Sequence, residues 1–174
     1  MAMHMKHTSA PLARYLAIAY ALLVAYASLH PLTGWRDNGV PVFDYLGAAW
    51  PRYYTGFDLA ANILAYLPLG FLLVPALQGR LGIAAAALIA ALAGGGLGFV
   101  LETLQNFLPS RVPSNIDLAC NAIGAMIGAA AGMNWGRALT DGGHLHRLRT
   151  RLAVDGPAAD FGLVLLGLWL LAQL

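Results

Sequence analysis

The sequence is poor in charge and nearly free of cysteine. Only 10% of its 174 residues are charged, while 59% are hydrophobic and the mean hydropathy is +0.66. An average soluble domain carries about 25% charged residues, so this composition excludes that class. The formal net charge of +2 gives no reason to expect a nucleic-acid partner. Cys120 is the only cysteine, so no disulfide forms within the chain, and its apolar neighbours favour a small buried side chain.

Long apolar segments are what the sequence has in abundance. Five of them lie at residues 11–29, 58–77, 81–108, 116–139 and 159–174. A run of about 20 apolar residues can cross a bilayer, and a backbone in lipid must satisfy its own hydrogen bonds as a helix. We therefore predict an all-α fold, a polytopic transmembrane bundle of about five helices, in a multi-pass protein of the cell (inner) membrane.

The positions of lysine and arginine predict the orientation, because cytoplasmic loops carry an excess of both. If the helices alternate in direction, one side collects Lys6, Arg14, Arg80, Arg137, Arg147, Arg149 and Arg151. The other side has only Arg36, Arg52 and Arg111. We expect a basic cytoplasmic N-terminus at 1–10 and a basic cytoplasmic loop at 140–158. The loops at 30–57 and 108–115 then face outward.

Both ends of the chain allow a second interpretation. The first segment has a basic start and an A-x-A pattern at residues 25–27, as signal peptides do, but its length favours an uncleaved helix. Residues 159–174 would span only about 24 Å at about 1.5 Å per residue, against a bilayer core of about 30 Å. We expect this fifth membrane helix to be truncated, with the native chain continuing past Leu174.

The outer loop at 30–57 is rich in aromatic residues, which favour the headgroup layer. They are Trp35, Phe43, Tyr45, Trp50, Tyr53, Tyr54 and Phe57. We expect residues 41–54 to lie along the outer membrane surface, with a short helix as one form. A simple anchor is favoured over a lid that covers a site beneath.

Two apolar segments open with the same polar pattern. DLAANILAYLPLG begins at Asp58 and DLACNAIGAMIG at Asp117, each with an amide four residues later on the same helix face. Glu102 lies near the far end of the segment between them. Acids cost about 2.5–3.5 kcal/mol at the bilayer centre. With alternating helices, all three acids lie at the outer end, where the cost is lower.

We therefore predict a polar pocket that is open to the outside. Its expected ligand-binding residues are Asp58, Asn62, Glu102, Gln105, Asp117 and Asn121, with Arg111 and Ser114 closing it from above. Each of these residues also has a purely structural explanation. The aspartates could cap their helices, the asparagines could form hydrogen bonds between helices, and Arg111 could form a salt bridge with Glu102. Caps do not account for Glu102, nor for the convergence of three acids and three amides.

Small residues share the faces that carry the acids, with the spacing that lets helix backbones approach closely. The predicted packing glycines are Gly94, Gly98, Gly124, Gly128 and Gly132. The acids should therefore point into the bundle and not toward lipid. The histidines have no convincing metal-ligand spacing, so we predict neither a metal site nor a cofactor.

The polar pattern resembles a known family. D-x-x-x-N-I-L-x-Y-x-P-L-G-F at 58–71, followed by E-T-x-Q-x-F-L-P-x-R-x-x-S-x-x-D-x-x-x-N-x-x-G at 102–124, resembles the VanZ-like family of integral membrane proteins. The resemblance covers about residues 50–133, and we take 11–139 as a VanZ-like four-helix membrane domain. It implies an association with teicoplanin resistance, and so with the cell envelope, the outer leaflet and cell-wall precursors. It carries over the same eight polar residues and supplies no settled catalytic mechanism.

Three functions remain open at this point. The leading one is binding of a membrane lipid headgroup or a lipid-linked cell-wall precursor. The alternative is a membrane-embedded enzyme acting on a lipid-linked phosphate or diphosphate, with the three carboxylates holding a divalent ion or with Glu102 as acid or base. The third, a transporter or flippase component, would need polar groups through the inner half of the bundle, which is composed of Ala, Gly, Leu and Ile.

Overall fold

The computed structural model describes residues 11–50, 53–136 and 162, and within them all regular structure is helical. The helices are α1 (Pro11–Leu29), α2 (Asp44–Gly47), α3 (Gly56–Leu77), α4 (Ile83–Gln105) and α5 (Asn115–Trp135). All but the short α2 are long and apolar enough to cross a membrane. The predicted all-α membrane bundle is thereby confirmed. The predicted fifth membrane helix at 159–174 and the two basic cytoplasmic segments lie outside the described residues.

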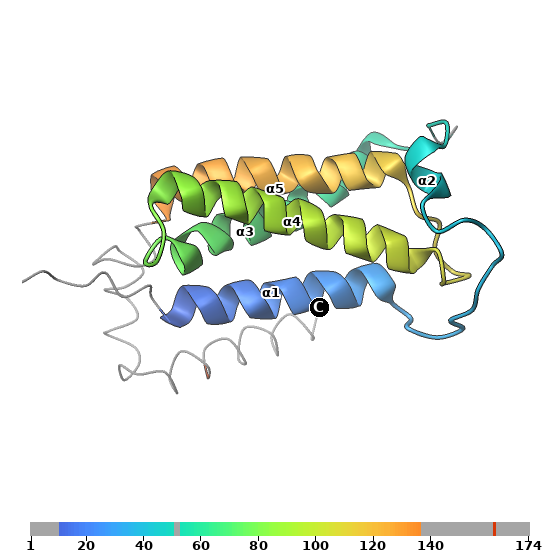
Figure 1. Cartoon of the computed structure of the whole chain (residues 1–174), viewed down its shortest axis with the longest axis horizontal. Helices are drawn as coiled ribbons and strands as arrows, with labels where there is room; N and C mark the ends of the chain where they lie inside the picture. Colours follow the sequence, from blue (N-terminus) through green and yellow to red (C-terminus); the bar gives the residue numbers. More distant parts are fainter. Residues whose placement is uncertain (1–10, 51–52, 137–161, 163–174) are drawn as a thin grey trace, which may run out of the picture.

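The four long helices alternate in direction along one elongated bundle (Figure 1). One end of the bundle gathers the C-termini of α1 and α4, the N-termini of α3 and α5, and the short α2. We call this the polar end, because it holds Asp58, Glu102 and Asp117. The alternation brings together three residues that lie up to 59 positions apart in the sequence, as expected.

The starts of α3 and α5 differ from the prediction by two residues and one residue, because the N-caps are Thr55 and Ser114 and not the two aspartates. The Thr55 hydroxyl accepts a hydrogen bond from Asp58 N (3.2 Å), and Asp58 Oδ2 accepts one from Thr55 N (2.9 Å). This reciprocal pair is a capping box. Ser114 Oγ accepts from Asp117 N at 3.4 Å. Each aspartate is therefore the third residue of its helix, and the interpretation of them as the N-caps themselves is corrected.

Backbone contact between α3 and α5 holds the bundle together. Gly124 and Gly128 of α5 lie against the carbonyl groups of Ile63 and Leu67 in α3, where an added Cβ would overlap with the carbonyl oxygen. One turn further along α5, a Cβ on Gly132 would lie 2.8 Å from the carbonyl oxygen of Phe71 in α3. Only glycine permits this separation, so the small-residue stripe sets how closely the two helices approach.

α4 packs on α5 through the other predicted glycine pair. A Cβ on Gly94 would lie 2.5 Å from Ala125 Cβ, and one on Gly98 would lie 3.1 Å from Asn121 Cβ. Gly70 of α3, which the sequence analysis did not include among the packing glycines, faces the carbonyl of Ala125. The three helices that carry the acids are thus packed together along their small-residue faces.

The outward surface of the long helices is apolar, as contact with lipid requires. Large exposed side chains include Ile18, Leu22, Leu64, Leu88, Leu92, Val100, Ile123, Met126 and Ile127. α1 packs mainly on α3, where the Tyr20 hydroxyl donates to the carbonyl of Ala65 at 3.1 Å. This contact places the C-terminal end of α1 beside the polar end of α3.

The aromatic loop between α1 and α3 runs along the end of α4. Most of its aromatic side chains are exposed, including Trp50, which is 71% exposed. Tyr45 of α2 is buried, and its hydroxyl shares a hydrogen bond with that of Thr103 at 3.1 Å. The Phe43 ring stacks on Phe99 with 5.9 Å between centroids. α2 is thus the short helix considered for this region.

The glycine contact predicts a sharp difference between two identical substitutions. Gly128→Ala places a methyl group onto the Leu67 carbonyl and should lower stability by about 1–3 kcal/mol, the usual cost of overpacking. Gly96→Ala is the matched control, because Gly96 is exposed in α4 with nothing within 4 Å of an added Cβ. Thermal melting in detergent, followed by tryptophan fluorescence, measures both. Equal melting temperatures for the two variants would contradict the close packing.

Candidate ligand-binding site

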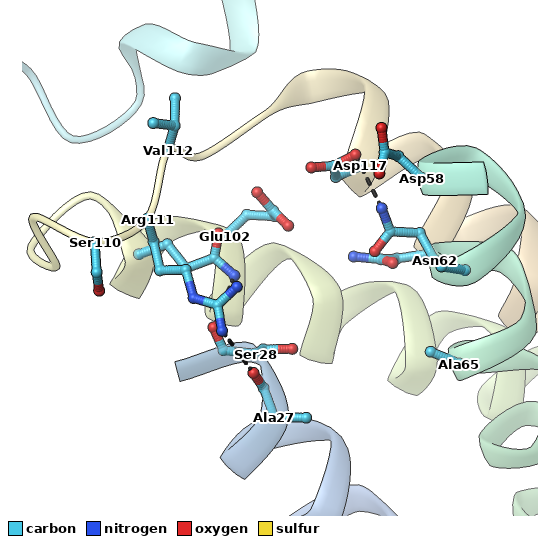
Figure 2. A pocket seen from close by; sticks show the side chains of 13 residues that line it. Ala27, Ser28, Asp58, Asn62, Ala65, Glu102, Ser110, Arg111, Val112 and Asp117 are labelled. Carbon is cyan, nitrogen blue, oxygen red and sulfur yellow. Dashed lines mark hydrogen bonds between the residues drawn. The ribbon is translucent and has the colours of Figure 1, made fainter. Parts of the chain in front are cut away.

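A cavity of about 490 Å³ opens at the polar end of the bundle (Figure 2). Its walls come from α1, α3, α4, α5 and the loop between α4 and α5. The lining residues are Ala27, Ser28, Asp58, Ala61, Asn62, Ala65, Glu102, Gln105, Ser110, Arg111, Val112, Asp117 and Asn121. Asp58 and Val112 are exposed, so the cavity reaches the protein surface at these residues.

The structure brings seven of the eight predicted ligand-binding residues around this cavity. The eighth, Ser114, is not among the lining residues. Its backbone N–H donates to Glu102 Oε2 at 2.8 Å, and its hydroxyl caps α5. Ser114 therefore positions an acid of the cavity and does not itself line the cavity.

Glu102 is the most buried of the three acids, with 4% of its surface exposed. Among the described residues, its carboxylate accepts one hydrogen bond, from Ser114 N, and that bond uses Oε2 alone. Burying a charged or polar group without full hydrogen bonding costs free energy. Helix capping does not require an acid here, because Glu102 lies in the last turn of α4.

Asp117 and Asp58 each have one oxygen bound within the protein. Asn62 Nδ2 donates to Asp117 Oδ1 at 2.9 Å and joins α3 to α5 (Figure 2). Asp58 Oδ2 accepts from both the backbone N–H and the hydroxyl of Thr55. Within the described part of the chain, the second oxygen of each aspartate has no hydrogen-bond partner from the protein. Asn62 thus makes the inter-helix link that its position suggested, and it also lines the cavity.

Asn121 behaves differently from Asn62, although it occupies the equivalent place in the repeated pattern. It is only 3% exposed, it lines the cavity, and its Oδ1 atom has no hydrogen-bond partner in the described structure. The hydroxyl of Tyr66, whose ring lies against the same glycine, Gly98, is also unpartnered. A buried polar group without a partner costs about 1–3 kcal/mol. Helix packing therefore gives no reason for an amide at position 121.

Arg111 binds the end of α1. Its Nε donates to the carbonyl of His30 at 3.1 Å, and its NH2 group donates to the carbonyl of Ala27 at 3.0 Å. These carbonyls belong to a helix end, where they have no intrahelical partner. Gln105 makes a similar contact, from Nε2 to the carbonyl of Ser28 at 3.2 Å. Among the residues that the structure describes, Arg111 makes no ion pair with Glu102.

The geometry gives no support to a metal ion shared by the three acids. In residues 11–50 and 53–136, no three His, Cys, Asp or Glu side chains come together in a group that could hold one ion. The Ser114 hydroxyl accepts a bond from the α5 backbone, and within the described residues it makes no hydrogen bond to a carboxylate or histidine that could act as its general base. The site is thus a cavity whose polar groups are unevenly satisfied by the protein.

Several lining residues were missed by the sequence analysis. They are Ala27, Ser28, Ala61, Ala65, Ser110 and Val112. The contribution of α1 had no sequence signal beyond Ser28, a small polar residue at the end of an apolar run. The aromatic loop was considered as a lid, but none of its described residues within 30–57 lines the cavity.

The fold and the cavity define a multi-pass helical membrane protein with a polar site at one end of its bundle. A family model described as VanZ/LLP1 matches residues 8–135, a range that includes all four long helices and every residue of the cavity. The chain belongs to this family, and the resemblance seen in its polar pattern is confirmed. No curated protein and no solved structure gives a significant match.

The two asparagines predict opposite responses to the same substitution. Asn62→Leu removes the donor that satisfies Asp117, so stability should fall by about 1–3 kcal/mol. Asn121→Leu removes no hydrogen bond and replaces an unpartnered amide by an apolar group of similar size, so stability should be unchanged or higher. Thermal melting of lipid-stripped protein in detergent tests the pair. A loss in Asn121→Leu as large as that in Asn62→Leu would show that the amide has a structural partner.

Proposed function

We propose that this protein binds an outer-leaflet lipid headgroup or a lipid-linked cell-wall precursor in the cavity at its polar end, within the cell (inner) membrane. The observation that carries the proposal is the buried, unpartnered amide of Asn121 in a cavity that three carboxylates also line. A link to glycopeptide (teicoplanin) resistance belongs to the same proposal and is motivated by the family resemblance alone.

The position and size of the cavity support a headgroup ligand. It lies where the membrane helices begin or end, which is the depth at which lipid headgroups lie. Its volume of about 490 Å³ falls within the range of about 300–1,000 Å³ that small-molecule sites occupy. Exposed aromatic side chains of the neighbouring loop, such as Trp50 and Tyr53, favour the same interfacial layer.

The distribution of basic residues supports an outward-facing cavity. Arg14 and Arg80 lie at the end opposite the polar end, and the sequence has further basic residues before α1 and after α5. An excess of basic residues marks the cytoplasmic side. The polar end would then meet the outer leaflet, where lipid-linked wall precursors are used.

Binding is favoured over catalysis and transport by what surrounds the cavity. In the described part of the chain, the acids form no group that could hold a metal ion, and the Ser114 hydroxyl makes no hydrogen bond to a base. The half of the bundle beyond Ala65 and Asn121 is filled by apolar side chains such as Leu69 and Val74. A transported polar group would find no partners there.

Native mass spectrometry of the purified protein tests the proposal. The triple variant Asp58→Asn, Glu102→Gln, Asp117→Asn should lose a lipid class that co-purifies with the unmodified protein. Asp44→Asn is the control, because this exposed carboxylate lies near the same end of the bundle but outside the cavity. Identical lipid profiles for the folded triple variant and the control would overturn the proposal and leave the acids with structural roles only.

Cysteine labelling tests the orientation. Cys120 is buried, and replacing it by alanine gives a background without thiols. Val112→Cys, at an exposed position in the α4–α5 loop, should react with a membrane-impermeant maleimide on intact cells. Gly82→Cys, at an exposed position with open space at the other end of the bundle, should react only after lysis. The reverse labelling pattern would place the cavity on the cytoplasmic side.

A further inference from the structure

We propose that the group accepted by the cavity is a primary ammonium, as an ethanolamine headgroup carries, and not a phosphate. This inference rests on the proposed function, because it names the chemistry of a ligand for the same site. It follows from the balance of charge in the cavity and from the polar atoms that the protein leaves without partners.

The balance of charge in the cavity is negative. Three carboxylates line it, those of Asp58, Glu102 and Asp117, against the single guanidinium of Arg111. The N-termini of α3 and α5 also point to this end, and each helix N-terminus contributes about half a positive charge. The C-termini of α1 and α4 lie at the same end and contribute about half a negative charge each, so they offset the two N-termini and the balance stays at about two negative charges. A cation would relieve the repulsion among the acids, whereas a phosphate would add to it.

Four hydrogen-bond donor atoms of the cavity are already used by the protein. Asn62 Nδ2 is bound to Asp117, and Gln105 Nε2 to the carbonyl of Ser28. Arg111 directs Nε and NH2 to two carbonyls at the end of α1. A phosphate needs several donors at once, and the most obvious one, the guanidinium, is held by α1.

The acceptors, by contrast, are left over. Glu102 Oε1, Asp58 Oδ1 and Asp117 Oδ2 receive no hydrogen bond from any described residue. The buried Oδ1 atom of Asn121 is unpartnered as well, in a side chain that is 3% exposed and lines the cavity. Figure 2 shows Glu102 reaching from α4 toward the side of the cavity where Asp58 and Asp117 lie. An ammonium has three donors and no acceptor, and hydrogen bonds to carboxylates are strengthened by charge.

The unpartnered acceptors also distinguish a primary ammonium from a quaternary one. A trimethylammonium carries the same charge but has no N–H group, so it would leave the acceptors of Glu102 and Asn121 unsatisfied. Choline and ethanolamine headgroups therefore form a matched pair of probes. They differ in hydrogen-bond donation while they share charge and phosphate.

The test is a lipid titration of the purified full chain in detergent, read by native mass spectrometry. The probes are short-chain phosphatidylethanolamine, phosphatidylcholine and phosphatidylglycerol. We expect the ethanolamine lipid to bind about tenfold more tightly than the other two, the factor expected for one charged hydrogen bond. Glu102→Gln should remove this preference, and Asp44→Asn should keep it. Asn121→Leu is a second variant, which should fold and should also lose the preference.

Soluble competitors distinguish the sources of the ammonium. Displacement by glycerophosphoethanolamine assigns the site to a lipid headgroup. Displacement by Nα-acetyl-lysine amide alone assigns it to the amine of a peptide-bearing precursor. Both results support the inference. Ethanolamine-lipid binding that neither competitor displaces would place the contact on the acyl chains and would overturn it.

The remaining outcomes separate this inference from the proposed function. A preference for phosphatidylglycerol that Glu102→Gln abolishes would overturn the ammonium inference and leave the binding site in place. Equal binding of all three lipids, unchanged in Glu102→Gln and Asn121→Leu, would overturn both.

Discussion

The close backbone contact between α3 and α5 is the constraint on which the rest of the structure depends. Where Gly124 and Gly128 meet α3, no side chain separates the two helices. Only at this separation can Asn62 reach Asp117 across the helix pair. α4 then packs on α5 through Gly94 and Gly98, and this contact buries Asn121. The polar cavity is therefore a consequence of small residues deeper in the same helices.

The three acids of the polar end are stabilised to different degrees by the protein around them. Asp58 and Asp117 lie in first turns, where a helix dipole and the capping interactions stabilise negative charge. Glu102 lies in the last turn of α4, where the dipole is unfavourable, and its compensation is the single N–H of Ser114. Buried acids with incomplete partners in membrane segments mark functional sites more often than packing. Of the three acids, Glu102 is thus the one that the protein's own contacts explain least.

The sequence predicted the helices and their polar faces well, because both depend on local periodicity. Four long apolar runs are visible without any tertiary information, and three of them carry polar residues three or four positions apart. The helix starts were misplaced because the cap residues Thr55 and Ser114 were not recognised, although a hydroxyl residue just before an apolar run is a known start signal. The family resemblance, drawn from the same polar pattern, was also correct.

The details of the cavity were beyond the sequence, because they depend on which helices meet. Asn62 and Asn121 occupy equivalent places in two nearly identical patterns, yet one binds a carboxylate and the other has an unpartnered oxygen. Nothing local distinguishes them. The contact of Arg111 with the carbonyls of Ala27 and His30 joins residues more than 80 positions apart and has no sequence signal either. Periodicity fixes the face of a helix and leaves its partner open.

The most direct test of the account is an experimental structure of the full chain by electron cryo-microscopy, in lipid nanodiscs that contain phosphatidylethanolamine. We expect Glu102, Asp117 and Asn121 to face one cavity, with headgroup density among them. A structure in which Glu102 faces the surrounding lipid, or in which side chains of the protein fill the cavity, would contradict it.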